Sequence, residues 1–126
     1  MSGRADPDCR RAYPVSLDAV DDAGRAHRAF VRAAVHARRA HVALRRGEVR
    51  VRATAGRALA LERVADGQRA IVALNAGDEP ADVPIAADGL DGLTHLEGVA
   101  VGSAEIRHDP SAIGLAARSA VVFVDG

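Results

Sequence analysis

Two periodicities divide the chain into a helical part and a strand-rich part. Between Arg25 and Gly47, apolar residues recur at steps of three and four, which is the spacing of one face of an α-helix. This helix stripe consists of Ala26, Ala29, Phe30, Ala33, Ala34, Ala37, Ala40, His41 and Leu44, and Gly47 is a natural end for the helix. From Val49 onward the period falls to two, as in Val49-Arg50-Val51-Arg52, and this alternation predicts β-strands.

Short runs separated by polar turns fill the rest of the chain. They cover residues 58–65, 68–74, 81–85, 93–96, 99–101, 104–106, 113–116 and 120–124. Asp66-Gly67 separates the first two, and a two-residue hairpin turn needs the positive φ angles that Asp and Gly tolerate. Because the chain is otherwise rich in alanine, we expect Leu59, Leu61, Ile71 and Val72 of this hairpin to supply much of the core.

This pattern predicts a mainly β fold, an antiparallel β-sandwich preceded by an N-terminal loop and one long α-helix. The loop and the helix occupy residues 1–47, and the sandwich occupies residues 48–126. A chain of 126 residues is too short for a complete barrel enzyme. The single Cys9 cannot form an internal disulfide. We find no signal peptide and no membrane span, so we expect a cytoplasmic protein without a membrane partner.

Charge is unevenly distributed. Residues 1–63 contain 14 arginines and 7 acidic residues, a net charge of +7, whereas residues 64–126 contain 3 arginines and 10 acidic residues, a net charge of −7. The arginine-rich stretch between Arg25 and Arg52 is the one feature that favours nucleic acid, but no aromatic platform lies beside it. We therefore expect a solvated or docked helix face and no nucleic-acid partner.

Metal binding and nucleophilic catalysis find no support in the sequence. His36 and His41 are five residues apart, which places them roughly 140° apart around a helix, so they cannot bind one metal as an i, i+4 pair would. Ser103, His108 and Asp109 contain the residue types of a catalytic triad, but no nucleophile elbow surrounds the serine. We expect no metal and no cofactor.

Four motifs in a fixed order carry a resemblance to a known family. They are Asp6-Pro7-Asp8-Cys9-Arg10-Arg11, the helix end from Arg38-Arg39 to Gly47, the turn Asp66-Gly67, and Val72-Ala73-Leu74-Asn75 before Glu79-Pro80. The chain resembles the C-terminal part of alpha-amylase-family glycoside hydrolases, most closely the neopullulanase, cyclomaltodextrinase and maltogenic amylase group. The resemblance spans the loop after the last barrel strand, the last barrel helix and the C-terminal β-sandwich.

This resemblance implies a sugar-contacting role for Asp6 and Arg10. In the family, the matching residues lie at the active-site face and contact the sugar at the non-reducing end of the substrate. Pro7 holds the preceding Asp6 extended, and the planar guanidinium of Arg10 can pair with a carboxylate or with sugar hydroxyls. Asp8 and Arg11 are expected to support the loop.

The resemblance also implies that the chain is inactive alone. The family's nucleophilic Asp, its acid Glu and a further Asp lie on earlier barrel strands that this chain does not contain. The helix also departs from the family pattern, with Val42 in place of the usual Pro and with Ala34 and Ala37 in place of larger aliphatics. We therefore expect the non-catalytic, C-terminal portion of an enzyme that acts on α-glucans.

Two other functions remain open at this point. One is an independent interaction or carbohydrate-binding module, although only Tyr13, Phe30 and Phe123 are aromatic. The other is one half of a split enzyme, completed by a barrel-bearing partner chain. Because an apolar helix stripe does not stay in water alone, we also expect a homo-oligomer or such a partner to cover it.

Overall fold

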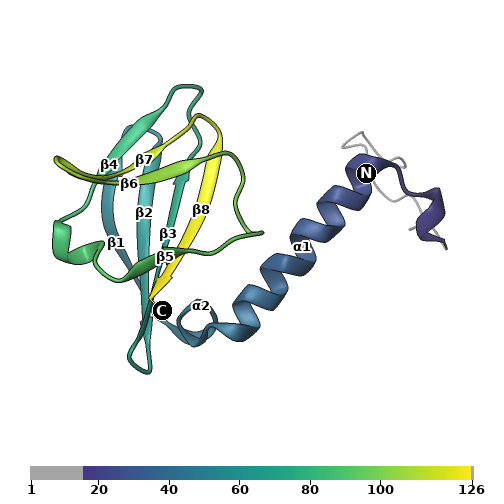
Figure 1. Cartoon of the computed structure of the whole chain (residues 1–126), viewed down its shortest axis with the longest axis horizontal. Helices are drawn as coiled ribbons and strands as arrows, with labels where there is room; N and C mark the ends of the chain where they lie inside the picture. The colour runs from purple at the N-terminus through teal and green to yellow at the C-terminus, as the bar shows by residue number, and fades with distance from the viewer. Residues whose placement is uncertain (1–15, 126) are drawn as a thin grey trace. The chain divides into compact units, whose positions relative to one another are not determined.

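The computed structural model describes residues 16–125. The chain divides into two compact units, Met1–Val31 and Arg32–Gly126. The helical elements are the 3-10 turns η2 (Leu17–Ala19) and η3 (Ala87–Gly89) and the α-helices α1 (Asp22–Ala40) and α2 (Val42–Arg46) (Figure 1). Asp21 caps the N-terminus of α1, because its Oδ1 accepts a 2.8 Å hydrogen bond from the backbone N–H of Gly24.

The predicted single helix is broken at His41, whose backbone is extended with φ −106° and ψ 113°. The break lets α2 turn toward the sheet, where Ala43 is fully buried in contact with Ala70 and Val124. Gln68 stabilises this arrangement, since its Oε1 accepts a 3.1 Å hydrogen bond from the N–H of Ala43. The predicted long helix is present as α1, but it ends at Ala40 and not at Gly47, because tertiary packing outweighs helix propensity there.

Within the described residues, eight antiparallel strands form two sheets. They are β1 (Glu48–Ala55), β2 (Ala58–Ala65), β3 (Gln68–Asn75), β4 (Ala81–Pro84), β5 (Leu93–His95), β6 (Ala104–His108), β7 (Ser111–Leu115) and β8 (Ser119–Asp125). The larger sheet has the order β1-β2-β3-β8-β5, and the smaller has the order β4-β7-β6. In Figure 1, β4, β7 and β6 cross in front of the strands of the larger sheet. The predicted mainly β fold is confirmed.

The hairpin of β2 and β3 matches its prediction closely. Its strands pair without interruption along their whole length. Asp66 has φ 51° and Gly67 has φ 76°, as the predicted turn requires. The strand predicted before β6 is reduced to a single bridge from Val101 to β8, because Gly98 and Gly102, with φ 78° and 70°, turn the chain on either side of it.

The core lies between the two sheets. Its large buried side chains are Val83, Ile85, Ile113 and Leu115 from β4, β7 and the segment after β4, and Ile71, Val121 and Phe123 from the larger sheet. Opposite them, β2 and β3 contribute mainly the buried alanines Ala58, Ala60 and Ala73.

The prediction for the hairpin's core residues is confirmed for one of four. Ile71 is fully buried, but Leu59, Leu61 and Val72 are only half-buried, because the strand pairing turns them to the outer side of the sheet. Alanine and leucine alternate in β2, so both sides of this strand are apolar and the pattern does not mark which one faces the core.

Candidate functional site

The predicted sugar-contacting pair, Asp6 and Arg10, lies outside the described residues, and its role stays a prediction. Residues 16–125 contain no group of three or more histidine, cysteine or acidic side chains placed to hold a metal ion. None of the helices described in the structure is long and apolar enough to cross a membrane.

Leucine and valine side chains line the outer side of the five-stranded sheet. Directly paired residues of antiparallel strands point to the same side of a sheet. The pairing therefore places Val51, Leu61, Val72 and Val122 in one row across β1, β2, β3 and β8. We call the apolar residues of this side that α2 leaves unburied the leucine face; they are Val49, Val51, Leu59, Leu61, Val72, Leu74, Ala120 and Val122.

Two polar residues on the same side of the sheet are occupied in holding α2. Arg63 donates 3.0 Å hydrogen bonds from Nε to the carbonyl of Ala43 and from Nη2 to the carbonyl of Gly47. Gln68 binds the N–H of Ala43, as described above. Helix α2 thereby covers one end of the outer side, and among the leucine-face residues it is Val122 that packs beside this contact.

The rest of the leucine face is open. Val49 is 53% exposed and Val51 is 63% exposed, while Leu59, Leu61 and Leu74 are half-buried. An antiparallel sheet with one side in water usually has apolar residues inward and polar residues outward. Strand β2 instead places alanine inward and leucine outward, and an exposed apolar patch of this kind marks an interaction site.

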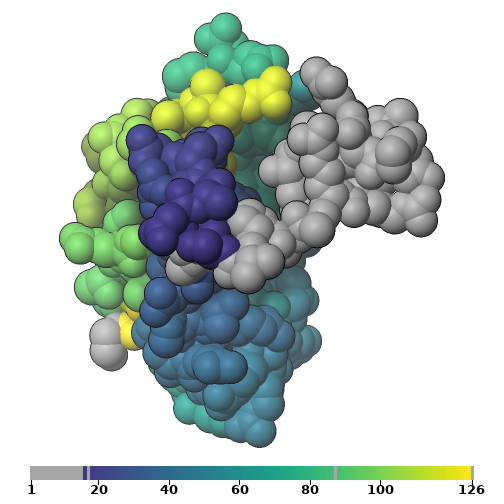
Figure 2. All heavy atoms as spheres, turned by 90° about the vertical axis from the view of Figure 1, so that its right-hand side faces the viewer, coloured from purple at the N-terminus to yellow at the C-terminus, as the bar shows by residue number. Residues whose placement is uncertain are grey.

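The helix stripe of α1 is partly exposed. Ala26 and Ala29 are exposed and Phe30 is half-buried, and on another side of the helix Val31 and Val35 are 44% and 45% exposed. In Figure 2, the atoms of α1 are coloured from purple to blue. Association of two chains through this stripe stays a prediction.

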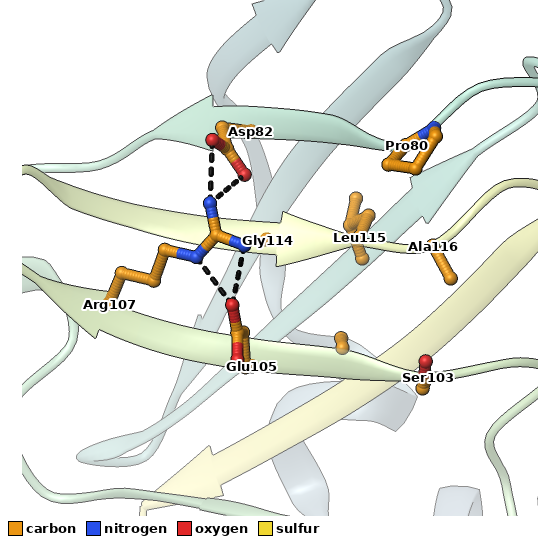
Figure 3. A pocket seen from close by; sticks show the side chains of 9 residues that line it. Pro80, Asp82, Ser103, Glu105, Arg107, Gly114, Leu115 and Ala116 are labelled. Atoms are coloured by element: carbon orange, nitrogen blue, oxygen red, sulfur yellow. Dashed lines mark hydrogen bonds and ion pairs between the residues drawn. The ribbon is translucent and has the colours of Figure 1, made fainter.

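A charged cluster lies on the outer side of the smaller sheet. The side chain of Arg107, from β6, crosses β7 and joins Asp82 of β4 to Glu105 of β6 (Figure 3). Nη1 of Arg107 lies 2.7 Å from both carboxylate oxygens of Asp82, and its Nε lies 2.5 Å from Oε1 of Glu105. The hydrogen bond to Glu105 and the charges of Asp82 and Glu105 raise the pKa of Arg107 above its ordinary value. We call these three residues the Arg107 cluster.

Gly114 makes the crossing possible. A Cβ atom at Gly114 would lie 3.1 Å from three atoms of the Arg107 guanidinium group. The guanidinium therefore rests directly on the backbone of β7, and a glycine inside a strand commonly marks such a close approach. Fixing the Arg107 side chain in one rotamer costs conformational entropy, and its ion pairs with Asp82 and Glu105 offset this cost.

The Arg107 cluster forms one end of an open pocket of about 290 Å³, which we call the β7 pocket. Figure 3 shows Pro80, Leu115, Ala116 and Ser103 at the other end, along the direction of β7. The pocket thus has hydrogen-bonding groups at one end and, at the other, Pro80 and Ala116 beside Ser103; the side chain of Leu115 belongs to the core.

Sequence reasoning did not find this pocket. Glu105 and Arg107 are two residues apart and so lie on one side of β6, and Gly114 interrupts an apolar strand. These two signals were available, but the partnership with Asp82 depends on β7 lying between β4 and β6. That strand order depends on the whole fold and cannot be predicted from local sequence.

Comparison of the sequence with family models gives no match, and no curated protein matches it significantly. Solved structures do match. The alpha-glucosyl transfer enzyme XgtA matches with a TM-score of 0.60 and 26% identity, over 81% of this chain and 17% of that enzyme. The Nostoc punctiforme debranching enzyme matches with a TM-score of 0.56 and 26% identity, over 73% of this chain and 18% of that enzyme. Eubacterium rectale Amy13B, with 16% identity and a TM-score of 0.55, shares the fold.

This chain spans less than a fifth of the length of XgtA and of the Nostoc debranching enzyme. These neighbours are alpha-amylase-family enzymes, so the matches confirm the resemblance at the level of that family. The closer likeness to the neopullulanase group stays a prediction. The sandwich of the described residues is therefore similar to a region of alpha-amylase-family enzymes, and the small share of each neighbour that it covers is consistent with a C-terminal domain.

Proposed function

We propose that this chain is the C-terminal, non-catalytic portion of an alpha-amylase-family enzyme acting on α-glucans, and that it covers and stabilises the catalytic body. Glycoside hydrolysis needs two carboxyl groups that flank the scissile bond. The two carboxylates of the β7 pocket, Asp82 and Glu105, both bind Arg107. This arrangement leaves them poorly suited to act as a separate acid and nucleophile.

The leucine face is the observation that carries the covering role. Leucine and valine side chains on the outer side of a sheet gain stability only when a second body removes them from water, at roughly 25 cal/mol per Å² of apolar surface. The matched region is 17% of XgtA and 18% of the Nostoc enzyme, so most of each neighbour is available as that second body.

The position of the leucine face fits a body that precedes the sandwich in the chain. Helix α2 connects α1 to β1 and borders the leucine face at Val122. A body joined through α1 therefore needs no long connection to reach this face. The body belongs to the same polypeptide or to a barrel-bearing partner chain, and the leucine face would serve in either case.

Exchanging the matched region of XgtA for this chain tests the covering role. The chimaera should fold and retain α-glucosyl transfer, and Val51→Lys should lower the temperature at which half of this activity is lost, because the variant buries an unpaired ammonium in the contact. In the isolated chain Val51 is 63% exposed, so the same variant should change the free energy of unfolding by less than about 0.5 kcal/mol.

Val64→Lys is the matched control for this exchange. Val64 is also an exposed valine, at 41%, and its pairing with Glu48 and Arg69 turns it to the side of the sheet opposite the leucine face. It should leave the thermal inactivation of the chimaera unchanged. Equal behaviour of the two lysine variants would refute docking through the leucine face.

The isolated chain should release no reducing sugar from starch, pullulan or cyclodextrins. The carboxylates of the β7 pocket, Asp82 and Glu105, are both paired with Arg107, and the family's catalytic carboxylates belong to barrel strands outside the matched region. The measurement is a reducing-sugar assay against a buffer blank. Activity above the blank that copurifies with the folded chain would contradict a non-catalytic role.

A further inference from the structure

We propose that the β7 pocket binds a segment of a neutral α-glucan, with a pair of sugar hydroxyls at the Arg107 cluster and an apolar sugar face against Pro80. This proposal rests on the proposed function for its ligand class, since α-glucans are the substrate of the proposed parent enzyme. The site is separate from the predicted contacts of Asp6 and Arg10, and it lies on the opposite sheet from the leucine face. It would hold glucan while the catalytic body is docked.

The hydrogen-bonding groups of the Arg107 cluster match adjacent hydroxyls. A guanidinium carries five N–H donors. Nε and Nη2 of Arg107 both approach Oε1 of Glu105, and Nη1 faces Asp82. Among residues 16–125, one N–H of Nη2 and the oxygen Oε2 of Glu105 therefore remain without a partner, one a donor and the other an acceptor. Two neighbouring hydroxyls of a sugar can accept from the first and donate to the second.

The cluster is also held in place before any ligand arrives. Arg107 is bound from both sides, and its guanidinium rests on the backbone at Gly114. A ligand that binds a fixed side chain does not have to order it, which removes one of the usual costs of binding. The polar end of the pocket stands on paired strands, which position side chains more rigidly than loops do.

Charge favours a neutral ligand over an ion. The Arg107 cluster contains one cation, Arg107, and two carboxylates, so its formal charge is −1 and it repels anions. A metal cation would have to displace the guanidinium that both carboxylates already bind. A neutral ligand with several hydroxyls is not repelled by the cluster and does not have to displace the guanidinium. It can use the hydrogen-bonding groups that the ion pairs leave open.

The pocket's size and lining point to weak binding. Its volume of about 290 Å³ is at the lower end of the range for small-molecule sites, roughly 300–1,000 Å³. The lining contains Pro80 but, among the residues that the structure describes, no aromatic ring on which a sugar could stack. We therefore expect a Kd on the order of 1 mM for a linear oligosaccharide.

Titration of the 126-residue chain with maltoheptaose, followed by amide NMR spectra, tests the proposal. Resonances of residues 103–107 and 114–116 should shift and saturate in the millimolar range. Arg107→Ala should weaken binding by at least about tenfold, the equivalent of 1.4 kcal/mol. Gly114→Ala should also weaken it, because the added methyl pushes the guanidinium away by a few tenths of an ångström while every charge is kept.

Arg50→Ala is the matched control. Arg50 is a strand arginine that binds a carboxylate two residues away, Glu48, at 3.0 Å, just as Arg107 binds Glu105. It lies in β1 of the other sheet, and its substitution should leave the Kd within about twofold of the parent. If Arg107→Ala unfolds the chain, Gly114→Ala and Glu105→Gln replace it in the comparison.

Three outcomes would overturn the proposal. They are shifts that do not saturate, an unchanged Kd in folded Gly114→Ala, and equal shifts caused by glycerol at the same hydroxyl concentration. None of these three outcomes would argue against the proposed covering role, because the XgtA exchange tests that role separately, through the leucine face. Conversely, saturable binding of maltoheptaose would stand even if Val51→Lys left the chimaera unchanged.

Discussion

Replacing Ile113 with alanine should lower the free energy of unfolding by about 2–5 kcal/mol. Ile113 is fully buried in the central strand of the smaller sheet, where it pairs with Val83 on one side and Ile106 on the other. The facing strands β2 and β3 contribute mainly alanines, which are too short to move into the space that the substitution leaves. The cavity should therefore persist, and urea denaturation followed by circular dichroism measures the loss.

Leu61→Ala is the informative comparison for this variant. Leu61→Ala removes three carbon atoms, as many as Ile113→Ala does. Leu61, however, is half-buried on the leucine face and lies outside the core between the sheets. Its loss should cost the isolated chain about 1 kcal/mol or less. If both variants lowered stability equally, Leu61 would lie in the core and the leucine face would not exist as described.

Local sequence signals predict where the strands lie, but they do not predict which side of each strand faces the core. The Asp66-Gly67 turn and the two runs beside it predict β2 and β3 almost residue by residue, because turn type and alternation are local properties. Which side of β2 faces the core was not predictable in the same way. Its alternation is between small and large apolar residues, so the choice depends on the space left by the opposing sheet.

The break in the helix has a similar origin. Residues 38–46 are mostly arginine, alanine and leucine, which favour helix, and the weaker helix formers His41 and Val42 are common inside helices, so propensity alone does not predict the break. The extended conformation of His41 follows from the burial of Ala43 and from its hydrogen bond to Gln68, 25 residues later. The same fold-level dependence hid the Arg107 cluster, whose members come from β4 and β6 on either side of β7.

Asn75→Ala should cost about 2–4 kcal/mol, because it would leave several buried polar groups without partners. Asn75 is 3% exposed. Its Nδ2 donates to the carbonyls of Glu79 and Ala116 at 2.8 and 3.1 Å, and its Oδ1 accepts from the N–H of Gly77 at 2.8 Å. This side chain therefore joins the turn after β3 to the segment after β7, and thermal or urea unfolding measures its contribution.

Ser119→Ala provides the control for Asn75→Ala. Ser119 pairs directly with Asn75, is equally buried at 3%, and donates a single 2.7 Å hydrogen bond to the carbonyl of Ala116. That carbonyl keeps its bond from Asn75 in the variant, so the loss should be about 1 kcal/mol. Because Asn75 binds beside Pro80 and at Ala116, both of which line the β7 pocket, Asn75→Ala should also disturb that end of the pocket. Equal losses of stability in the two variants would mean that water replaces the bonds of Asn75, and its role in joining the two segments would then fall.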